Sequence, residues 1–190
     1  ANEPTFDGEK VTLIPETKLA WAALSQAGFH AAHHDAEYGG LQLPEVILRT
    51  CVAYFSAANI ATAGYSFLTI GAANLVKSFA SDALRDRFLP PMLDGRYSGT
   101  MALTEPGQGS ALGDIRTSAR QSADGSYRVF GQKMFISGGD HELTENIVHM
   151  VLARIEGAPA GVKGISLFLV PKVLVNDAGH LGKRNDVALA

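Results

Sequence analysis

Two glycine-containing segments carry the residue types that could bind a cofactor. The first, Met101–Asp114, reads MALTEPGQGSALGD and places a hydroxyl, a carboxylate and closely spaced glycines after an apolar run. The second, Gly131–Glu142, reads GQKMFISGGDHE and places an aromatic side chain two positions before a hydroxyl. Glycines after a strand let the backbone approach a phosphate or a ring closely. Both segments are therefore candidate binding loops.

The first segment departs from the common nucleotide motifs. A dinucleotide fingerprint requires Gly-x-Gly-x-x-Gly between a strand and a helix, but after Gly107 and Gly109 the next glycine, Gly113, comes one residue late. The residues that follow look like a strand rather than a helix. A phosphate-binding P-loop requires Gly-Lys-Ser/Thr, and the segment contains no lysine. Taken alone, the segment is also typical of a tight loop between strands.

The side chains of the two segments together suit a flat ring with polar edges. We predict that Phe135 and Ser137 lie on one strand, so that alternation directs both side chains to the same face. Thr104 supplies a further hydroxyl just after its own strand. An aromatic face with hydrogen-bonding groups at the edge is what the isoalloxazine ring of a flavin requires.

The first half of the chain has a helical pattern. After one short amphipathic segment, Pro44 is a suitable first residue for a second helix. The run from Asn59 to Ala80 is rich in Ala and apolar nearly all round, which indicates a buried helix. Ser81 is a suitable N-cap for a further helix, which we expect to end at Pro90 and Pro91.

Past Tyr97 the pattern changes to short runs rich in β-branched and aromatic residues, which predict strands. These runs are TSARQ, SYRVFGQKMFIS, NIVHMVLARI and GISLFLVPK. The turn residues Ala123–Gly125 between the first two predict a hairpin. We therefore predict an α+β multidomain chain, with a helical N-terminal domain over 1–97 followed by an antiparallel β middle domain over 98–190.

Composition excludes several classes of partner. The chain has 190 residues, 46% of them hydrophobic, and a net charge of −3, which does not favour nucleic acid as a partner. No uninterrupted apolar run reaches the roughly 18 residues of a membrane span. Cys51 has no partner for an internal disulfide and reads as a small buried apolar residue. The sequence starts without Met and stops in strand-like residues, so we expect both ends to be truncated.

The sequence resembles the acyl-CoA dehydrogenase family over nearly its whole length. The resemblance rests on EYGGLQLP, on LTEPGQGS with LGDIRTSA, and on the long segment from YRVFGQKMFISGGDHE to GISLFLVPK. The last segment is most similar to the branch that includes 3-(methylthio)propanoyl-CoA dehydrogenases. The resemblance implies FAD as cofactor and oxidation of an acyl-CoA thioester to the trans-2-enoyl-CoA, as in fatty acid β-oxidation.

The family fold implies a helical N-terminal domain, a β middle domain and a C-terminal helical bundle. The first two match the two halves of this sequence, and the bundle is absent from it. In the family the catalytic base is a Glu in or near that bundle, so the resemblance implies no catalytic residue in this sequence. It also implies electron transfer to an electron-transferring flavoprotein, a homo-oligomer in the intact enzyme, and a cytoplasmic location.

The resemblance assigns binding roles residue by residue. The flavin contacts it implies are Met101, Leu103, Thr104, Phe135 and Ser137, and the substrate contacts it implies are Gly109 and Ser110. Phe135 takes the place of an aromatic residue that is most often Trp in the family. Two positions depart from the family pattern: Ala111 replaces a usual Asp, and Gln108 replaces a usual small residue. These departures leave the substrate undefined.

Other polar residues have simpler interpretations. Glu105 lies in the first motif and reads as a residue that supports the loop rather than as a base. The segments HAAHHD (30–35) and GGDHE (138–142) contain metal-ligating residue types. Loop hydrogen bonds and capping explain both segments without a metal, so we predict no metal site. Glu142 and Glu145 read as a solvated face.

Two aromatic residues of the long helix have alternative roles. Tyr65 and Phe67 could line an acyl pocket, but packing in the core is the preferred interpretation. Two alternative functions also remain at this stage. The chain could be a catalytically inactive fragment that binds flavin or acyl-CoA, or part of an acyl-CoA oxidase, which shares the fold and passes electrons to O₂.

Overall fold

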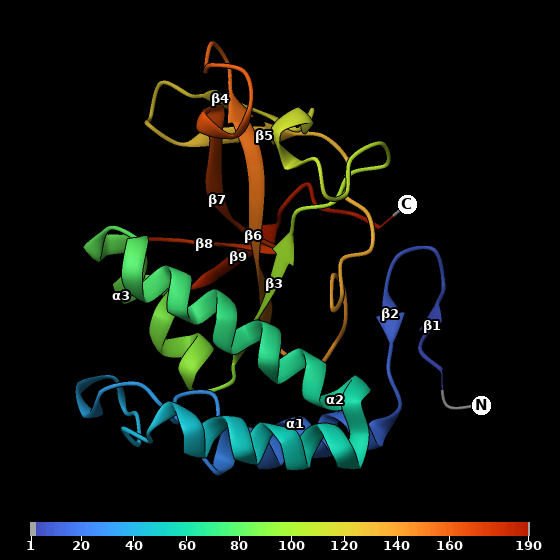
Figure 1. The fold of residues 1–190 in the computed structure, drawn as a ribbon, viewed down its shortest axis with the longest axis vertical. Coiled ribbons are helices and arrows are strands. Elements are labelled where there is room, and N and C mark those ends of the chain that lie inside the picture. Colours follow the sequence, from blue (N-terminus) through green and yellow to red (C-terminus); the bar gives the residue numbers. More distant parts are fainter. Residues whose placement is uncertain (1–2, 190) are drawn as a thin grey trace.

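The computed structural model describes residues 3–189 and places a helical layer beneath a standing β-sheet (Figure 1). The helices are α1 (Pro15–Gln26), α2 (Glu45–Phe79) and α3 (Asp82–Leu93), with short 3-10 helices η1 (Ala36–Tyr38), η2 (Leu112–Asp114) and η3 (Val162–Gly164). The strands are β1 (Thr5–Phe6), β2 (Val11–Thr12), β3 (Tyr97–Ala102), β4 (Ser118–Gln121), β5 (Tyr127–Phe130), β6 (Asn146–Ile155), β7 (Ile165–Pro171), β8 (Val173–Val175) and β9 (Leu181–Arg184). The order of helices before sheet is the predicted one. The small β1–β2 hairpin was not predicted.

The main sheet is organised around β6. On one edge β6 pairs with β7 in the antiparallel direction. On the other edge it pairs in parallel with β3 through its first half and with β4 at its end. The expectation of an antiparallel domain is therefore wrong for β3 and β4, and the sheet is mixed. The long segment between β3 and β6 allows this, because parallel strands need a long connection.

The predicted hairpin around Gly125 is confirmed. β4 and β5 pair in the antiparallel direction. Their connection is closed by two backbone hydrogen bonds, from Ser122 N to Ser126 O (2.8 Å) and from Gly125 N to Ser122 O (3.0 Å). Gly125 has φ 84°, a left-handed conformation in which glycine carries little strain.

Helix α2 is interrupted at Asn59, where the sequence pattern also divides it. Asn59 has φ −160° and ψ 100°, so the backbone leaves the helical conformation there and resumes it afterwards. The Asn59 side chain accepts a hydrogen bond from Thr62 N at 2.9 Å. This is the geometry of an N-cap, in which a side-chain oxygen bonds the amide three residues later. Asn59 therefore starts the second half of α2.

We expect Asn59→Ala to lower the free energy of unfolding by about 1 kcal/mol, the usual loss for an N-cap. The amide of Thr62 would lose its acceptor at the kink. Asn59→Asp, which keeps an acceptor oxygen, should retain most of the stability. Urea denaturation of the two variants measures the difference. Equal stability of both variants and wild type would show that the kink does not depend on this cap.

Helix α3 confirms one predicted boundary and corrects the other. Ser81 is its N-cap and accepts a hydrogen bond from Leu84 N. The expected end at Pro90 and Pro91 is wrong, because the helix continues to Leu93. The two prolines remove backbone donors only near the C-terminal end of the helix. The burial of its last apolar residues against the sheet offsets that loss.

The second half of α2 is buried on one side only. Its buried positions are Ala63, Ser66, Thr69, Ile70, Ala72, Ala73 and Val76, whereas Phe67 is exposed. By length and composition alone α2 is apolar enough to cross a membrane, with a mean hydropathy of 1.3 over its most apolar window. The earlier expectation considered only uninterrupted apolar runs. In this structure the buried side of α2 contacts α3 and β3 in the core of a folded protein.

The core joins α2 and α3 to one face of the sheet. Gly99 of β3 lies against this helix pair, and a Cβ at this position would lie 2.4 Å from Ala72 Cβ and 3.0 Å from Met92 Cε. Its amide also donates to Thr69 Oγ1 at 3.0 Å. The close approach of α2 to β3 therefore requires the absence of a side chain at position 99.

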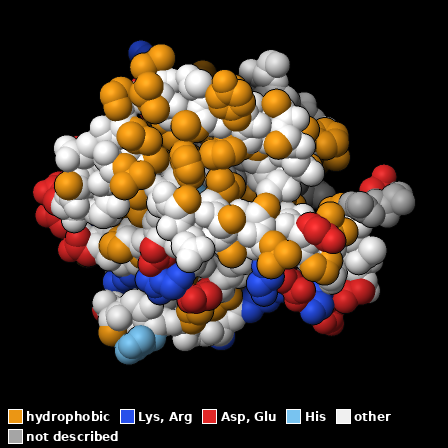
Figure 2. All heavy atoms as spheres, turned by 90° about the horizontal axis from the view of Figure 1, so that it is seen from below, with side chains coloured by type: hydrophobic (Ala, Val, Ile, Leu, Met, Phe, Trp, Pro, Cys, Tyr) orange, Lys and Arg blue, Asp and Glu red, His pale blue; other side chains and the backbone are white. Residues whose placement is uncertain are grey.

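Apolar side chains gather on one part of the lower face of the molecule, and charged side chains lie along the rest of it (Figure 2). This face is formed by α1 and α2 (Figure 1). The large exposed apolar residues of these two helices are Leu19, Val46, Ile47, Tyr54, Ile60, Phe67 and Phe79. A groove between the two helices has a volume of about 370 Å³.

Candidate functional site

The two candidate binding loops meet directly, although they are distant in the sequence. Met134 N donates to Thr104 O at 2.9 Å. Lys133 Nζ donates to Leu103 O at 3.0 Å and to Glu105 Oε1 at 2.9 Å. These contacts hold the segment 133–135 beside the segment 103–105. The structure thus brings together Leu103, Thr104 and Phe135 from the predicted set.

The local conformation of Phe135 and Ser137 differs from the prediction. β5 ends at Phe130, and residues 131–137 do not form a strand. The chain leaves the ladder at Gly131, which has φ 155° and lies so close to Thr117 that a Cβ would clash. The alternation argument therefore does not apply to these two side chains. Both are nevertheless exposed on this part of the surface.

Phe135 combines two unusual properties. Its side chain is 86% exposed, and its backbone has φ 58°. A left-handed conformation costs a residue with a bulky side chain about 1–3 kcal/mol and persists only where the surroundings impose it. Because the Phe135 ring is exposed to water, burial of its apolar surface does not offset this cost. Such strain is concentrated at ligand sites, so Phe135 is a candidate ligand contact on geometric grounds.

The remaining predicted residues lie on or beyond the end of β3. Met101, Leu103 and Thr104 are half-buried. Met101 packs against the helix-side core. Gly109 and Ser110 are exposed beyond a tight turn that is closed by the pair Glu105 N to Gln108 O (2.8 Å) and Gln108 N to Glu105 O (3.1 Å). The predicted substrate residues therefore lie on a projecting loop whose base is formed by the predicted cofactor residues.

Glu105 supports the loop, as its sequence context predicted. Its carboxylate accepts hydrogen bonds from Arg116 N (2.7 Å), Thr117 N (2.9 Å) and Lys133 Nζ (2.9 Å). Burial alone would raise the pKa of Glu105, but the hydrogen bonds from Thr117, Arg116 and Lys133 lower it to about 2. A carboxylate with this pKa and these partners is ionised at neutral pH and is a poor proton acceptor.

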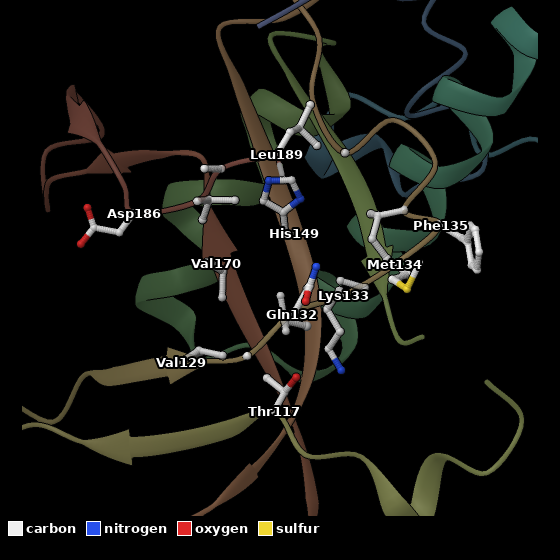
Figure 3. A pocket seen from close by; sticks show the side chains of 17 residues that line it. Thr117, Val129, Gln132, Lys133, Met134, Phe135, His149, Val170, Asp186 and Leu189 are labelled. Atoms are coloured by element: carbon white, nitrogen blue, oxygen red, sulfur yellow. The ribbon is translucent and has the colours of Figure 1, made fainter. Parts of the chain in front are cut away.

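A cavity of about 560 Å³ lies beside the second binding segment, whose residues 131–136 form part of its lining (Figure 3). Ala102 lines it, and alternation along β3 places Met101 and Leu103 on the opposite face. Its lining also includes Gln132, Lys133 and His149. Phe135 stands at its edge, apart from these side chains.

His149 is a buried polar residue that the sequence reasoning did not single out. His149 Nδ1 and Thr100 Oγ1 are 2.8 Å apart, and both residues face the cavity side of the sheet. Burial lowers the pKa of His149 to about 4. The available signal was a histidine flanked on both sides by apolar residues, in NIVHMVLARI.

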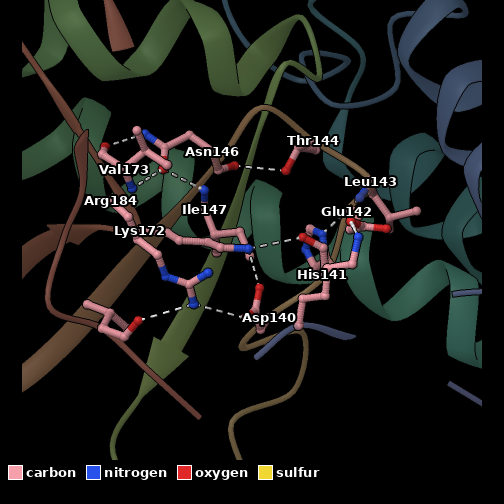
Figure 4. A network of polar contacts seen from close by, with 12 residues as sticks. Asp140, His141, Glu142, Leu143, Thr144, Asn146, Ile147, Lys172, Val173 and Arg184 are labelled. Atoms are coloured by element: carbon pink, nitrogen blue, oxygen red, sulfur yellow. Dashed lines mark hydrogen bonds and ion pairs between the residues drawn. The ribbon is translucent and has the colours of Figure 1, made fainter. Parts of the chain in front are cut away.

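The GGDHE segment is held by hydrogen bonds and ion pairs (Figure 4). Asp140 pairs with Lys172 and with Arg184. Burial would raise the pKa of Asp140, but these two cations lower it. Glu142 pairs at the surface with Lys10 at 2.7 Å. The carboxylates of this segment thus serve loop structure, as predicted, and Glu142 and Glu145 are exposed.

His141 connects the sheet to the loop that follows it. Leu143 N donates to His141 Nδ1 at 3.2 Å, so the ring proton lies on Nε2. His141 Nε2 then donates to Ser98 Oγ at 3.1 Å. The Ser98 hydroxyl donates onward to Thr144 Oγ1, which donates to Asn146 O. This chain of donors uses both ring nitrogens of His141 and leaves neither for a metal.

Two histidines of HAAHHD, His30 and His33, have separate hydrogen-bond partners, and neither ring nitrogen of His34 has one among the described residues. His30 contacts the hydroxyls of Ser25 and Ser66 at 3.0 and 3.2 Å. His33 contacts Asn74 at 2.8 Å. His30 and His34 are buried. Within residues 3–189 no group of three metal-ligating side chains gathers here or elsewhere.

The two aromatic residues of α2 have different surroundings. Tyr65 packs edge-on against His141, with ring centroids 5.1 Å apart, and its ring covers Gly138. Tyr65 is only partly buried and packs on the GGDHE loop, so the preferred interpretation of core packing is not met. Phe67 is 52% exposed and is not a core residue. Cys51, expected to be buried, is only partly covered.

Comparison with known proteins identifies the family of both halves. The family described as "Acyl-CoA dehydrogenase, N-terminal domain" matches residues 6–96, and "Acyl-CoA dehydrogenase, middle domain" matches residues 100–184. A 3-methylmercaptopropionyl-CoA dehydrogenase of Ruegeria pomeroyi is 40% identical over 180 residues, which cover 95% of this chain and 31% of that protein. The chain therefore spans about a third of the length of this curated relative.

Solved structures share the fold. Glutaryl-CoA dehydrogenase from Mycobacterium smegmatis superimposes with a TM-score of 0.70 at 26% identity, covering 84% of this chain and 38% of that chain. An acyl-CoA dehydrogenase complexed with FAD from Bacillus anthracis superimposes with a TM-score of 0.69 at 27% identity, covering 82% of this chain and 25% of that chain.

Proposed function

The chain belongs to the acyl-CoA dehydrogenase family, and from this premise we propose that it forms the FAD-facing part of an acyl-CoA dehydrogenase. The reaction proposed for the whole enzyme is oxidation of an acyl-CoA thioester to the trans-2-enoyl-CoA. The observation that carries the proposal is the strained and exposed Phe135, held beside Thr104 by the Met134–Thr104 hydrogen bond.

The residues present fit a flavin by their chemistry. Phe135 offers a flat aromatic face, and Thr104 and Ser137 offer hydroxyl groups that can donate to ring carbonyls or accept from ring N–H groups. Leu103 adjoins these groups through its backbone, since Leu103 O accepts from Lys133 Nζ, whereas the Met101 side chain packs against the helix-side core. When bound, FAD would accept the hydride that leaves the β carbon of the substrate.

The projecting loop beyond Thr104 is the proposed contact for acyl-CoA. Gly109 and Ser110 are exposed there, and glycine permits close approach of a ligand to the backbone. Ala111 cannot provide the carboxylate that is usual in the family at this position. The acyl chain that the enzyme prefers is not assigned.

Proton abstraction requires a base outside this set of residues. Glu105 is the carboxylate nearest the proposed flavin surface in sequence, but its oxygens are occupied by backbone amides and by Lys133. We therefore propose that the base is supplied by another part of the enzyme, as the family resemblance implies. Electron-transferring flavoprotein as acceptor, a homo-oligomeric state and a cytoplasmic location belong to the same proposal.

The proposed flavin contact predicts the effect of removing one aromatic ring. We expect Phe135→Ala to weaken FAD binding about tenfold, which corresponds to roughly 1.4 kcal/mol of lost contact. Phe130→Ala is the matched control, because Phe130 is also exposed but lies on β5. Quenching of FAD fluorescence during titration measures both affinities. Equal loss in the two variants, or no loss in Phe135→Ala, would contradict the proposed contact.

Reduction by substrate distinguishes the alternative functions. Anaerobic addition of acyl-CoA to the full-length, FAD-loaded protein should bleach the long-wavelength flavin absorption if the protein is a dehydrogenase or an oxidase. A dehydrogenase then transfers electrons to electron-transferring flavoprotein, whereas an oxidase consumes O₂ at a comparable rate. Bound FAD without bleaching by acyl-CoA of any chain length would identify a binding fragment.

A further inference from the structure

We propose that Glu105 and Lys133 are a positioning pair that sets the spacing between the two flavin-facing segments, 103–105 and 133–135. The inference rests on the proposed FAD site and extends it to residues that do not contact the cofactor in the proposal. Both side chains are nearly buried, with 5% of Glu105 and 11% of Lys133 exposed. Neither charge is therefore available to solvent.

Glu105 joins three segments of the chain at one carboxylate. Oε2 accepts from Arg116 N at 2.7 Å, and Oε1 accepts from Thr117 N at 2.9 Å and from Lys133 Nζ at 2.9 Å. Residues 116–117 lead directly into β4, which pairs with the end of β6. The carboxylate therefore anchors the projecting loop to the sheet on both sides of that loop.

Lys133 connects this anchor to the second segment. Its ammonium group donates to Leu103 O at 3.0 Å as well as to Glu105. One residue later, Met134 N donates to Thr104 O at 2.9 Å. Three successive positions, 103 to 105, are thus bonded to two successive positions, 133 and 134. These hydrogen bonds fix the distance between Thr104 and Phe135, the residue that follows Met134.

The pair also explains how the strain at Phe135 is maintained. A left-handed backbone at a bulky residue relaxes unless the adjoining residues are held. Phe135 makes no use of burial to hold its conformation, because 86% of its surface is exposed. The preceding residues, Lys133 and Met134, are fixed by the contacts described above. The constraint on Phe135 therefore comes from the buried pair together with the Met134–Thr104 backbone hydrogen bond.

A second buried pair provides a matched control. Lys172 and Asp140 are 16% and 3% exposed and form an ion pair that anchors the GGDHE loop (Figure 4). Removing one partner of either pair leaves a buried charge and costs stability, whereas removing both charges costs less. Both double variants remove a buried ion pair, and Asp140→Asn also weakens the pairing with Arg184. Only Glu105→Gln/Lys133→Met removes contacts between segments 103–105 and 133–135.

The test compares Glu105→Gln/Lys133→Met with Asp140→Asn/Lys172→Met and wild type in the full-length protein. Lys133→Arg serves as the conservative variant, since it keeps the charge beside Glu105. FAD affinity is measured by fluorescence titration, and the free energy of unfolding by urea denaturation. Amide hydrogen exchange over residues 103–110 and 131–137, without FAD, reports whether the two segments remain held.

We expect Glu105→Gln/Lys133→Met to weaken FAD binding about tenfold or more and to speed exchange in both segments. Lys133→Arg, which keeps the charge, should retain more FAD affinity than Glu105→Gln/Lys133→Met. Asp140→Asn/Lys172→Met should lower stability without either effect. If the first variant loses stability but keeps wild-type FAD affinity, or if both double variants lose affinity equally, the positioning role is wrong and the pair is only structural. If wild type itself does not bind FAD, the proposed function fails, and unchanged exchange in the first variant would then refute the pair's role in holding the two segments.

Discussion

Acidification below about pH 6 is expected to unfold the protein, because its buried histidines must take up protons. Burial lowers the pKa of His30, His34, His141 and His149 from the ordinary 6.5 to about 4. The folded protein therefore binds fewer protons than the unfolded chain between these two values. The contribution of these histidines to the free energy of unfolding is fully present above their pKa in the unfolded chain, 6.5, and is lost as the pH falls toward 4.

The size of this effect follows from the shifts. Each histidine can contribute on the order of 3 kcal/mol across this range, and most small domains have only about 5–15 kcal/mol in total. Charges near two of the rings act in opposite directions: Lys172 further disfavours protonation of His141 and His149, and Asp140 favours it. Burial remains the largest cause for all four. We therefore expect the transition well before pH 4.

Urea denaturation at several pH values between about 7 and 5 measures how steeply the free energy of unfolding changes with pH. This slope gives the number of protons taken up on unfolding. His149→Asn should reduce that number by up to one, because one buried titrating group is removed. The exposed His180 is the matched control, and His180→Asn should leave the slope unchanged. A free energy of unfolding that does not vary over this range would contradict the burial of neutral histidines.

A side chain at position 99 is expected to separate α2 from β3. In Gly99→Val the new Cβ would meet Ala72 Cβ at 2.4 Å, Met92 Cε at 3.0 Å and Thr69 Cα at 3.4 Å. Overpacking of a close-packed core costs about 1–3 kcal/mol and more where the backbone must move. Two of the three contacts belong to α2, so the helix itself must shift. The Gly99–Thr69 hydrogen bond would weaken as well.

The same change should reach the proposed FAD surface. Gly99 lies in β3, and the same strand ends close to Met101, Leu103 and Thr104. We expect Gly99→Val to lower the melting temperature by several degrees and to weaken FAD binding. Gly107→Ala is the control, because a Cβ at Gly107 meets nothing within 4 Å. Equal melting temperatures for both variants would show that the helix can move without cost.

Local signals predicted those features that depend on neighbours in the sequence. Ser81 was identified as an N-cap from its type and position, and its hydrogen bond to Leu84 is present. Gly125 marked a hairpin, and the break before Asn59 coincides with the kink in α2. Each of these depends on one or a few residues whose backbone preference is strong. The family motifs also marked two segments, 103–105 and 133–135, that the structure brings into contact.

Features that depend on distant residues could not be predicted in this way. The parallel pairing of β6 with β3 and β4 is set by how the chain returns, which alternation does not reveal. The left-handed conformation of Phe135 directly follows two residues, Lys133 and Met134, that contact 103–105, a segment about 30 positions away in the sequence. From sequence, the run SYRVFGQKMFIS predicted a strand through Ser137. The structure keeps Phe135 and Ser137 at the surface by another backbone path.

β3 and β4 lie on the same edge of β6, and this arrangement determines which part of the chain between them can vary. Each of the two strands is registered independently by its own pairing with β6. The projecting loop between them can therefore change in length or sequence without shifting the register of the sheet. Glu105 closes the base of that loop, so the variable part lies beyond it. Under the proposed function, the residues proposed to contact acyl-CoA can therefore vary while those proposed to face FAD stay in place.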